Sequence, residues 1–255
     1  MLRKFSNTRS VFFGRAGLIF FMAFLCSSYS GKQTVLIHSH NDYQKNIPFY
    51  RAYSQQVHTI EADIYAAPAS DGLLVAHDPH ELDSALSLDE MYLEPLIFLF
   101  GQNEGRPWRG SEQVLTLMID LKTPLHPTID RLIAKLKRHP EVFDPSVNPY
   151  AVRIVISGSR PDPEAFGEYP RFISFDGFID VDYTPQQLER VAFISEPFFR
   201  YSKWKGGADT LSAEDRQVIE SLVAKSHKTG KPIRFWGSPD TVNAWETFRE
   251  LGIDI

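Results

Sequence analysis

The acidic pair Glu61 and Asp63 is the clearest chemical signal in this sequence of 255 residues. The two residues are two positions apart, so on a strand both carboxylates project from the same face. Carboxylates held together repel each other unless a cation lies between them or one of them is protonated. Asp120, late in a separate apolar run, would complete an all-oxygen site suited to Mg²⁺ or Ca²⁺. The alternative interpretation is that these acids are solvated or paired with Lys122 and nearby arginines.

Three histidines supply a second kind of chemistry, because imidazole titrates near neutrality without help from its surroundings. His38, His40 and His77 each stand at or just after the end of an apolar run. We expect these side chains to act in proton transfer. Residues at comparable positions, which are expected to contact a substrate, are Asn41, Lys122 and Trp236.

Short apolar runs carry these side chains. Their continuous rather than alternating apolar character indicates strands buried on both faces, as in a parallel sheet covered by helices. The runs cover residues 34–38, 58–64, 73–76, 114–121, 152–156, 172–175, 192–194 and 233–236. Helix-like stretches lie between them at residues 128–138, 184–190, 213–228 and 241–251.

This alternation predicts a single α/β domain over residues 31–255, and a (β/α)8 TIM barrel is favoured over a doubly wound sheet. No glycine-rich phosphate loop follows a predicted strand, which removes the main support for a dinucleotide-binding sheet. The last run, residues 252–255, is short, so the barrel is expected to lack a full final strand. Active sites of barrels are built at the carboxyl ends of the strands, and the polar residues named above are therefore expected to converge.

Composition and the first thirty residues bound the class of protein. Hydrophobic residues make up 43% and charged residues 23%, which is typical of a globular protein. The net charge of −5, without a basic cluster after residue 15, indicates that nucleic acid is not a partner. Basic residues at positions 3, 4, 9 and 15 precede an apolar stretch and then a small, polar one. This order predicts a signal peptide over residues 1–30 and a secreted or periplasmic protein.

Five motifs together resemble the phosphatidylinositol phospholipase C-like phosphodiesterase superfamily, which includes glycerophosphodiester phosphodiesterases and sphingomyelinase D. The branch named for altered inheritance of mitochondria protein 6 is the most similar. The motifs are HSHNDY (38–43), EADIY (61–65), DGLLVAHD (71–78), LMIDLKT (117–123) and KPIRFW (231–236).

The resemblance implies a (β/α)8 barrel with two histidines as general acid and base and with one divalent ion held by Glu61, Asp63 and Asp120. His77 matches the second catalytic histidine of the superfamily. His38 and His40 both lie where the glycerophosphodiesterases have a His-Arg pair, so the first catalytic histidine stays open. The arginine of that pair has no counterpart here, and Lys122 is its expected substitute.

The expected function is that of a secreted, metal-dependent phosphoric diester hydrolase acting on a glycerophosphodiester or phospholipid-like substrate. Its partner would be a small-molecule or lipid-headgroup phosphodiester, with membrane-surface contact and oligomeric state left open. One alternative is a zinc-dependent hydrolase in which His38 and His40 are metal ligands. Another is a barrel that binds a ligand without turning it over.

Overall fold

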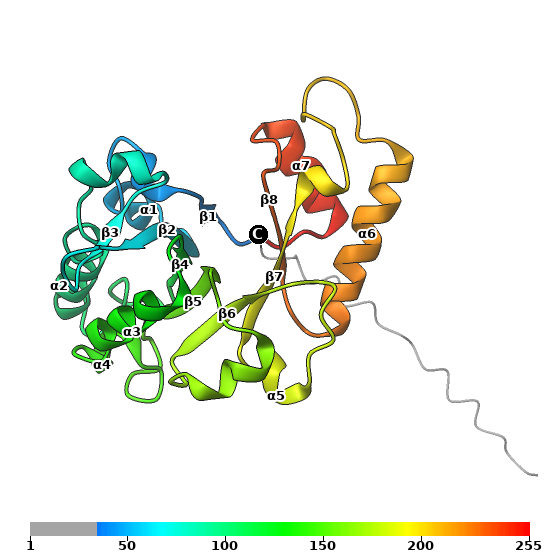
Figure 1. Ribbon diagram of the computed structural model, residues 1–255. Helices are drawn as coiled ribbons and strands as arrows, with labels where there is room; N and C mark the ends of the chain where they lie inside the picture. Colours follow the sequence, from blue (N-terminus) through cyan, green and yellow to red (C-terminus); the bar gives the residue numbers. More distant parts are fainter. Residues whose placement is uncertain (1–34) are drawn as a thin grey trace, which may run out of the picture. The chain divides into compact units, whose positions relative to one another are not determined.

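Seven parallel strands form the central sheet of the computed structural model, which describes residues 35–255. The predicted signal peptide over residues 1–30 lies outside the described residues. In sheet order the strands are β1 (His38–Ser39), β2 (Thr59–Ala66), β4 (Thr116–Leu121), β5 (Arg153–Gly158), β6 (Ile173–Gly177), β7 (Val191–Pro197) and β8 (Ile233–Trp236), as Figure 1 shows. The prediction of an α/β fold with a parallel sheet is confirmed.

Helices connect the strands. They are α1 (Tyr50–Ser54), α2 (Glu94–Gln102), α3 (Leu125–Leu136), α4 (Pro140–Phe143), α5 (Pro185–Leu188), α6 (Ala213–Lys228) and α7 (Val242–Leu251). Ser212 caps α6 and Thr241 caps α7. Their hydroxyl oxygens accept hydrogen bonds from the backbone N–H groups of Asp215 and Ala244, respectively. No helix within residues 35–255 combines the length and the hydropathy that crossing a membrane requires.

A complete (β/α)8 barrel is not what the sheet shows. The run at 73–76 was expected to be a barrel strand, but β3 (Leu73–Val75) pairs antiparallel with β2 and stands outside the parallel order. The last residues form no strand of their own, as their length predicts. They instead make backbone hydrogen bonds to both ends of the sheet: Leu36 N donates to Asp254 O at 2.7 Å, and the N–H groups of Asp254 and Ile255 donate to Ile233 O at 3.2 and 3.3 Å.

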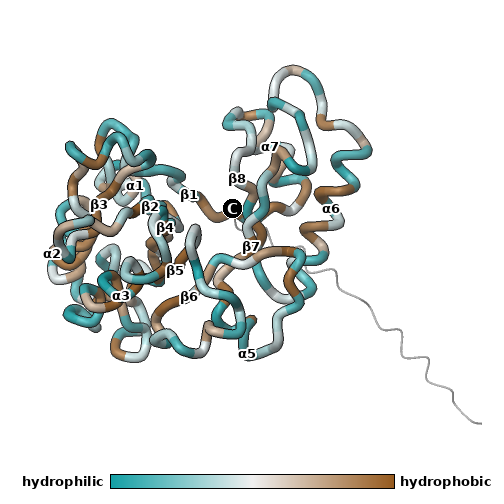
Figure 2. The backbone as a smooth tube through the Cα atoms, viewed as in Figure 1, coloured by the Kyte–Doolittle hydropathy of each residue, from teal (hydrophilic) through white to brown (hydrophobic). Residues whose placement is uncertain are grey.

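The strands present apolar residues to the helices, and their opposite face carries polar residues beside a small apolar cluster of Met118, Val155 and Phe193. In β2, Ile60, Ala62 and Ile64 are fully buried in the large core that also contains residues of α2 and α3. Glu61 and Asp63 alternate with them and therefore project from the other face. The alternation along the strands therefore places their polar residues together on the inner face. Helix α6 also alternates hydrophobic and hydrophilic segments along its length, as Figure 2 shows.

Candidate active site

Strand register brings the predicted carboxylate ligands together. Asp63 of β2 lies opposite Asp120 of β4, and Asp120 lies opposite Ser157 of β5. One oxygen from each of Glu61, Asp63 and Asp120 lies within 4.8 Å of the others. Glu61 and Asp63 are buried, whereas Asp120 is partly exposed. This group is what a divalent-cation site requires, because hard cations prefer several oxygen ligands.

Lys122 supplies a positive charge inside this group. Its Nζ lies 2.9 Å from Asp63 Oδ2 and 2.5 Å from Asp120 Oδ2, so the expected pairing of the acids with Lys122 is also present. Burial alone would lower the pKa of Lys122, but the bonds to the two carboxylates outweigh it and raise that pKa.

The residues present fit a divalent cation. Asp63 Oδ1 is buried and has no hydrogen-bond partner in the described part of the chain. An orphaned carboxylate oxygen is unfavourable unless a further ligand completes it. Burial accordingly raises the pKa of Asp63, although Lys122 opposes the shift. The cluster of metal-ligating side chains found within residues 35–255 contains these three carboxylates and no histidine. That composition favours Mg²⁺ or Ca²⁺ over zinc.

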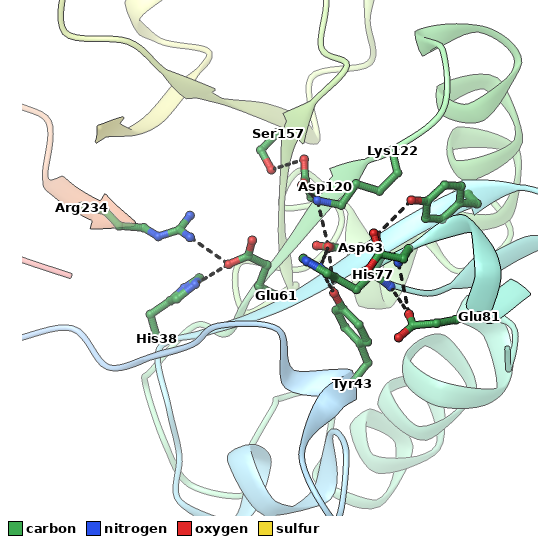
Figure 3. Close-up of polar contacts among 12 residues, drawn as sticks. His38, Tyr43, Glu61, Asp63, His77, Glu81, Asp120, Lys122, Ser157 and Arg234 are labelled. Atoms are coloured by element: carbon green, nitrogen blue, oxygen red, sulfur yellow. Dashed lines mark hydrogen bonds and ion pairs between the residues drawn. The ribbon is translucent and has the colours of Figure 1, made fainter. Parts of the chain in front are cut away.

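The two histidines of HSH occupy different environments. His38, on β1, has a side chain that is 9% exposed, and its Nε2 lies 2.6 Å from Glu61 Oε2 (Figure 3). Burial lowers the pKa of His38 to about 4, and the charge of Arg234 adds to this effect. His40, two residues further on, lines the central cavity, whereas His38 does not. Burial also lowers the pKa of His40.

His77 follows β3 and reaches the site from the other side. Its Nδ1 lies 3.1 Å from Asp63 Oδ2, and its ring is 43% exposed. The Tyr43 hydroxyl donates to the same Asp63 oxygen at 2.8 Å and lies 3.1 Å from His77 Nδ1. Glu81 fixes the backbone, because its carboxylate accepts the N–H of His77 at 2.7 Å (Figure 3). The contacts at Nδ1 leave Nε2 of His77 as the nitrogen that can meet a substrate.

A cavity of about 480 Å³ lies over these residues. All three residues expected to contact a substrate, Asn41, Lys122 and Trp236, line it together with His40 and His77. Its remaining walls are polar and aromatic and include Ser157, Gly158, Arg160, Asp176, Phe178, Ser195 and Arg234. The volume suits a small-molecule group.

One side of the cavity holds polar residues that the sequence analysis missed. Arg160 lies over the ring of Phe178 at 3.8 Å, and its Nη2 is buried and has no hydrogen-bond partner within residues 35–255. Asp176 Oδ1 and Ser195 Oγ are likewise buried, and neither atom has a partner at hydrogen-bonding distance and angle within the described residues. Burial raises the pKa of Asp176 to about 6, although Arg160 and Arg234 oppose the shift. We call Arg160, Asp176 and Ser195 the polar corner.

Arg234 and Tyr43 were also missed. A signal for Arg234 and for Asp176 was available, because a charged residue inside an apolar run must be buried with a partner or face a site. Tyr43 stands in the HSHNDY motif, but an aromatic residue after a strand carries no such mark. Its role depends on the long-range contact with Asp63.

Comparisons with known proteins identify relatives of this chain and solved structures that share its fold. The model of the AIM6-like phosphodiesterase domain matches residues 29–143, a segment that contains the three carboxylates and the three candidate histidines. The altered inheritance of mitochondria protein 6 homolog of Arthroderma benhamiae is 33% identical over 233 residues, which are 80% of this chain and 72% of that protein.

The protein named altered inheritance of mitochondria protein 6 from Eremothecium gossypii is 25% identical over 86% of this chain. Its counterpart from Lachancea thermotolerans is 25% identical over 80% of this chain. The chain spans 65% and 57% of the lengths of these two curated relatives.

Two solved structures share the fold. A glycerophosphodiester phosphodiesterase from Parabacteroides distasonis has a TM-score of 0.51 at 15% identity, over 88% of this chain and 92% of that chain. A calcium-dependent phosphoinositol-specific phospholipase C from Pseudomonas sp., in its myo-inositol complex, has a TM-score of 0.54 at 15% identity, over 88% and 90%.

Fold, site and comparisons together define a phosphodiesterase-like domain of the phosphatidylinositol phospholipase C-like superfamily, as the motifs predict. Within that superfamily, the chain belongs to the altered inheritance of mitochondria protein 6 family.

Proposed function

We propose that this protein is a cation-dependent phosphoric diester hydrolase that acts on a glycerophosphodiester or phospholipid-like substrate by two-histidine acid/base catalysis. The observation that carries the proposal is the cluster of Glu61, Asp63 and Asp120, because Glu61 and Asp120 line the same cavity as His40 and His77. The family model and the solved neighbours support the general reaction class.

Glu61, Asp63 and Asp120 would hold one divalent cation. When bound, Mg²⁺ or Ca²⁺ supplies positive charge that neutralises the phosphate oxygens of the substrate and favours attack at phosphorus. The calcium dependence named for the phospholipase C neighbour is compatible with this assignment.

The two cavity histidines divide the proton transfers. Burial lowers the pKa of His40, so its imidazole is neutral near pH 7 and can take the proton of the attacking hydroxyl or water. As the new P–O bond forms, the ester P–O bond breaks. His77 then gives a proton to the leaving oxygen, because Asp63 orients its ring through Nδ1.

The polar corner fits the alcohol part of such a substrate. Hydroxyl groups both donate and accept hydrogen bonds, so they can satisfy the guanidinium of Arg160 and the carboxylate of Asp176 at once. Phe178 and Trp236 would wall the carbon skeleton. The phospholipase C neighbour was solved with myo-inositol, which is a polyol, and this supports a hydroxylated headgroup here.

Export is part of the proposal. The order of basic, apolar and small residues over residues 1–30 supports a cleaved signal peptide and a secreted or periplasmic protein. Amino-terminal sequencing of the protein recovered from the producing cells is expected to begin near residue 31. An intact amino terminus on the cell-associated protein would contradict export by cleavage.

Substitution tests the assignment of roles. Glu61→Ala and His77→Ala are each expected to abolish hydrolysis of glycerophosphocholine and of a generic aryl phosphodiester. Circular dichroism of each variant should match that of the wild-type protein, which shows that the loss is chemical. Wild-type rates in both variants would contradict the mechanism.

A further inference from the structure

The Glu61 carboxylate is held from two sides by buried side chains. His38 Nε2 lies 2.6 Å from Glu61 Oε2, and Arg234 Nη2 donates to the same oxygen at 2.9 Å. The side chains of His38 and Arg234 are 9% and 5% exposed. All hydrogen bonds of this carboxylate within the described residues use Oε2, so Oε1 stays available to a ligand in the cavity.

The contacts of His38 identify its tautomer. Glu61 Oε2 accepts an N–H of Arg234, and it acts as an acceptor toward His38 Nε2 as well. His38 Nδ1 is buried and has no hydrogen-bond partner among the residues that the structure describes. A buried N–H without an acceptor is more unfavourable than an unprotonated ring nitrogen. His38 therefore carries its proton on Nε2 and donates it in a hydrogen bond to Glu61.

Arg234 holds Glu61 from the second side, through a charged side chain that extends from another strand of the sheet. It stands on the four-residue strand β8, and its Nη1 lies 3.0 Å from Met118 Sδ. Met118 lies opposite Glu61 in the register of β2 and β4. The guanidinium therefore bridges neighbouring strands at the level of the candidate ligand and compensates a carboxylate that is 5% exposed.

We infer that His38 and Arg234 form a clamp that fixes the orientation of Glu61 for a cation, so that His38 is a positioning residue and His40 alone of the HSH pair transfers protons. The inference rests on the proposed cation site. Outer groups that orient metal ligands typically contribute about 10- to 100-fold to metal affinity. Loss of the clamp is expected to weaken cation binding by that factor.

Calorimetric titration of the full chain with Mg²⁺, and in parallel with Ca²⁺, tests the clamp. His38→Ala should raise the Kd by about 10- to 100-fold. His38→Gln places an amide N–H near the position of Nε2 and should keep most of the affinity. Arg234→Lys keeps the charge but cannot bridge Glu61 and Met118, so its affinity should also fall. His40→Ala is the matched control, because no hydrogen bond or ion pair joins its imidazole to Glu61 within the described residues, and its affinity should match that of the wild type.

The rate of hydrolysis at a saturating cation concentration distinguishes a residue that positions Glu61 from one that transfers a proton. His38→Ala should recover activity as the Mg²⁺ concentration rises, whereas His40→Ala should stay inactive at every concentration. Thermal unfolding checks that each variant is folded, and Arg234→Lys decides the question if His38→Ala does not fold. Wild-type affinity in the folded clamp variants would overturn the clamp alone. A His38→Ala protein as inactive as His40→Ala at saturation would do the same. A wild-type chain that binds neither cation would overturn the proposed function as well.

Discussion

Asp176 makes the free energy of unfolding of the protein depend on pH. This carboxyl is 5% exposed on β6, and burial raises its pKa from 3.8 to about 6 despite Arg160 and Arg234. A shift of one pKa unit corresponds to about 1.4 kcal/mol, so this shift of roughly two units is worth about 3 kcal/mol. Because the folded-state pKa is raised, the stabilisation is complete below about pH 4 and is lost as the pH rises through about 6.

Asp176→Asn isolates this effect, because asparagine does not ionise. The free energy of unfolding of the variant, relative to wild type, should rise by about 2 kcal/mol between pH 4.5 and pH 7, which is most of the full shift. Urea denaturation at both pH values, in the presence of EDTA, measures the difference. Asp209→Asn makes the same chemical change at an exposed position and serves as the matched control.

Subtracting the variant from the wild type at each pH removes the titration of groups that both proteins share. A relative stability of Asp176→Asn that is the same at pH 4.5 and pH 7 would refute the reasoning, and so would a change of opposite sign. The expected result would mean that the protein retains an ionised, poorly partnered carboxylate at neutral pH at the expense of stability. A ligand hydroxyl in the polar corner would supply the missing partner.

Three further substitutions test the site. Tyr43→Phe removes the hydroxyl that donates to Asp63, so urea denaturation should show a loss of about 1 kcal/mol, and an unchanged free energy of unfolding would count against this contact. Gly158→Ala places a Cβ on Asp120 Oδ1 at a residue with a φ of +67°, so it should destabilise the fold by at least about 1 kcal/mol and weaken Mg²⁺ binding. Calorimetry checks the second effect, and wild-type affinity in a folded variant would contradict it. Lys122→Met leaves Asp63 and Asp120 without their counter-charge, so Mg²⁺ should raise the melting temperature of the variant more than that of wild type. Equal shifts in the two proteins would show that Lys122 does not neutralise the cation site.

Local signals in the sequence predict several elements. The helix predicted over residues 213–228 coincides with α6, because Ser212 caps it and charged residues on one side leave an apolar stripe. The stretch at 241–251 likewise matches α7, whose start depends on the Thr241 hydroxyl. Capping and periodicity act within a few residues, which is why a single sequence reveals them.

Pairing direction and barrel closure depend on contacts that a local pattern does not contain. The apolar run at 73–76 could pair in either direction, and it pairs antiparallel with β2. The run at 34–38 was expected to be a strand buried on both faces, but β1 holds only His38–Ser39, and Val35 and Ile37 are 42% and 55% exposed. The short carboxyl-terminal segment offers this run a single backbone partner, at Leu36.

The candidate site divides in the same way. The spacing of Glu61 and Asp63 places both carboxylates on one face from the sequence alone, since a strand alternates its side chains. The convergence of Asp120 with them follows from strand register, which the barrel assumption anticipated. The different environments of His38 and His40 could not be predicted, because they depend on Arg234, which comes from the far end of the chain.

The most direct test of the central claim is the hydrolysis of glycerophosphocholine and of a generic aryl phosphodiester by the full chain, first with EDTA and then with Mg²⁺, Ca²⁺ or Zn²⁺ added back. The cluster of three carboxylates, two of which line the cavity of His40 and His77, leads us to expect no activity with EDTA and recovery with Mg²⁺ or Ca²⁺. Activity that survives EDTA, or that returns only with Zn²⁺, would contradict the account, and so would the absence of hydrolysis with every cation.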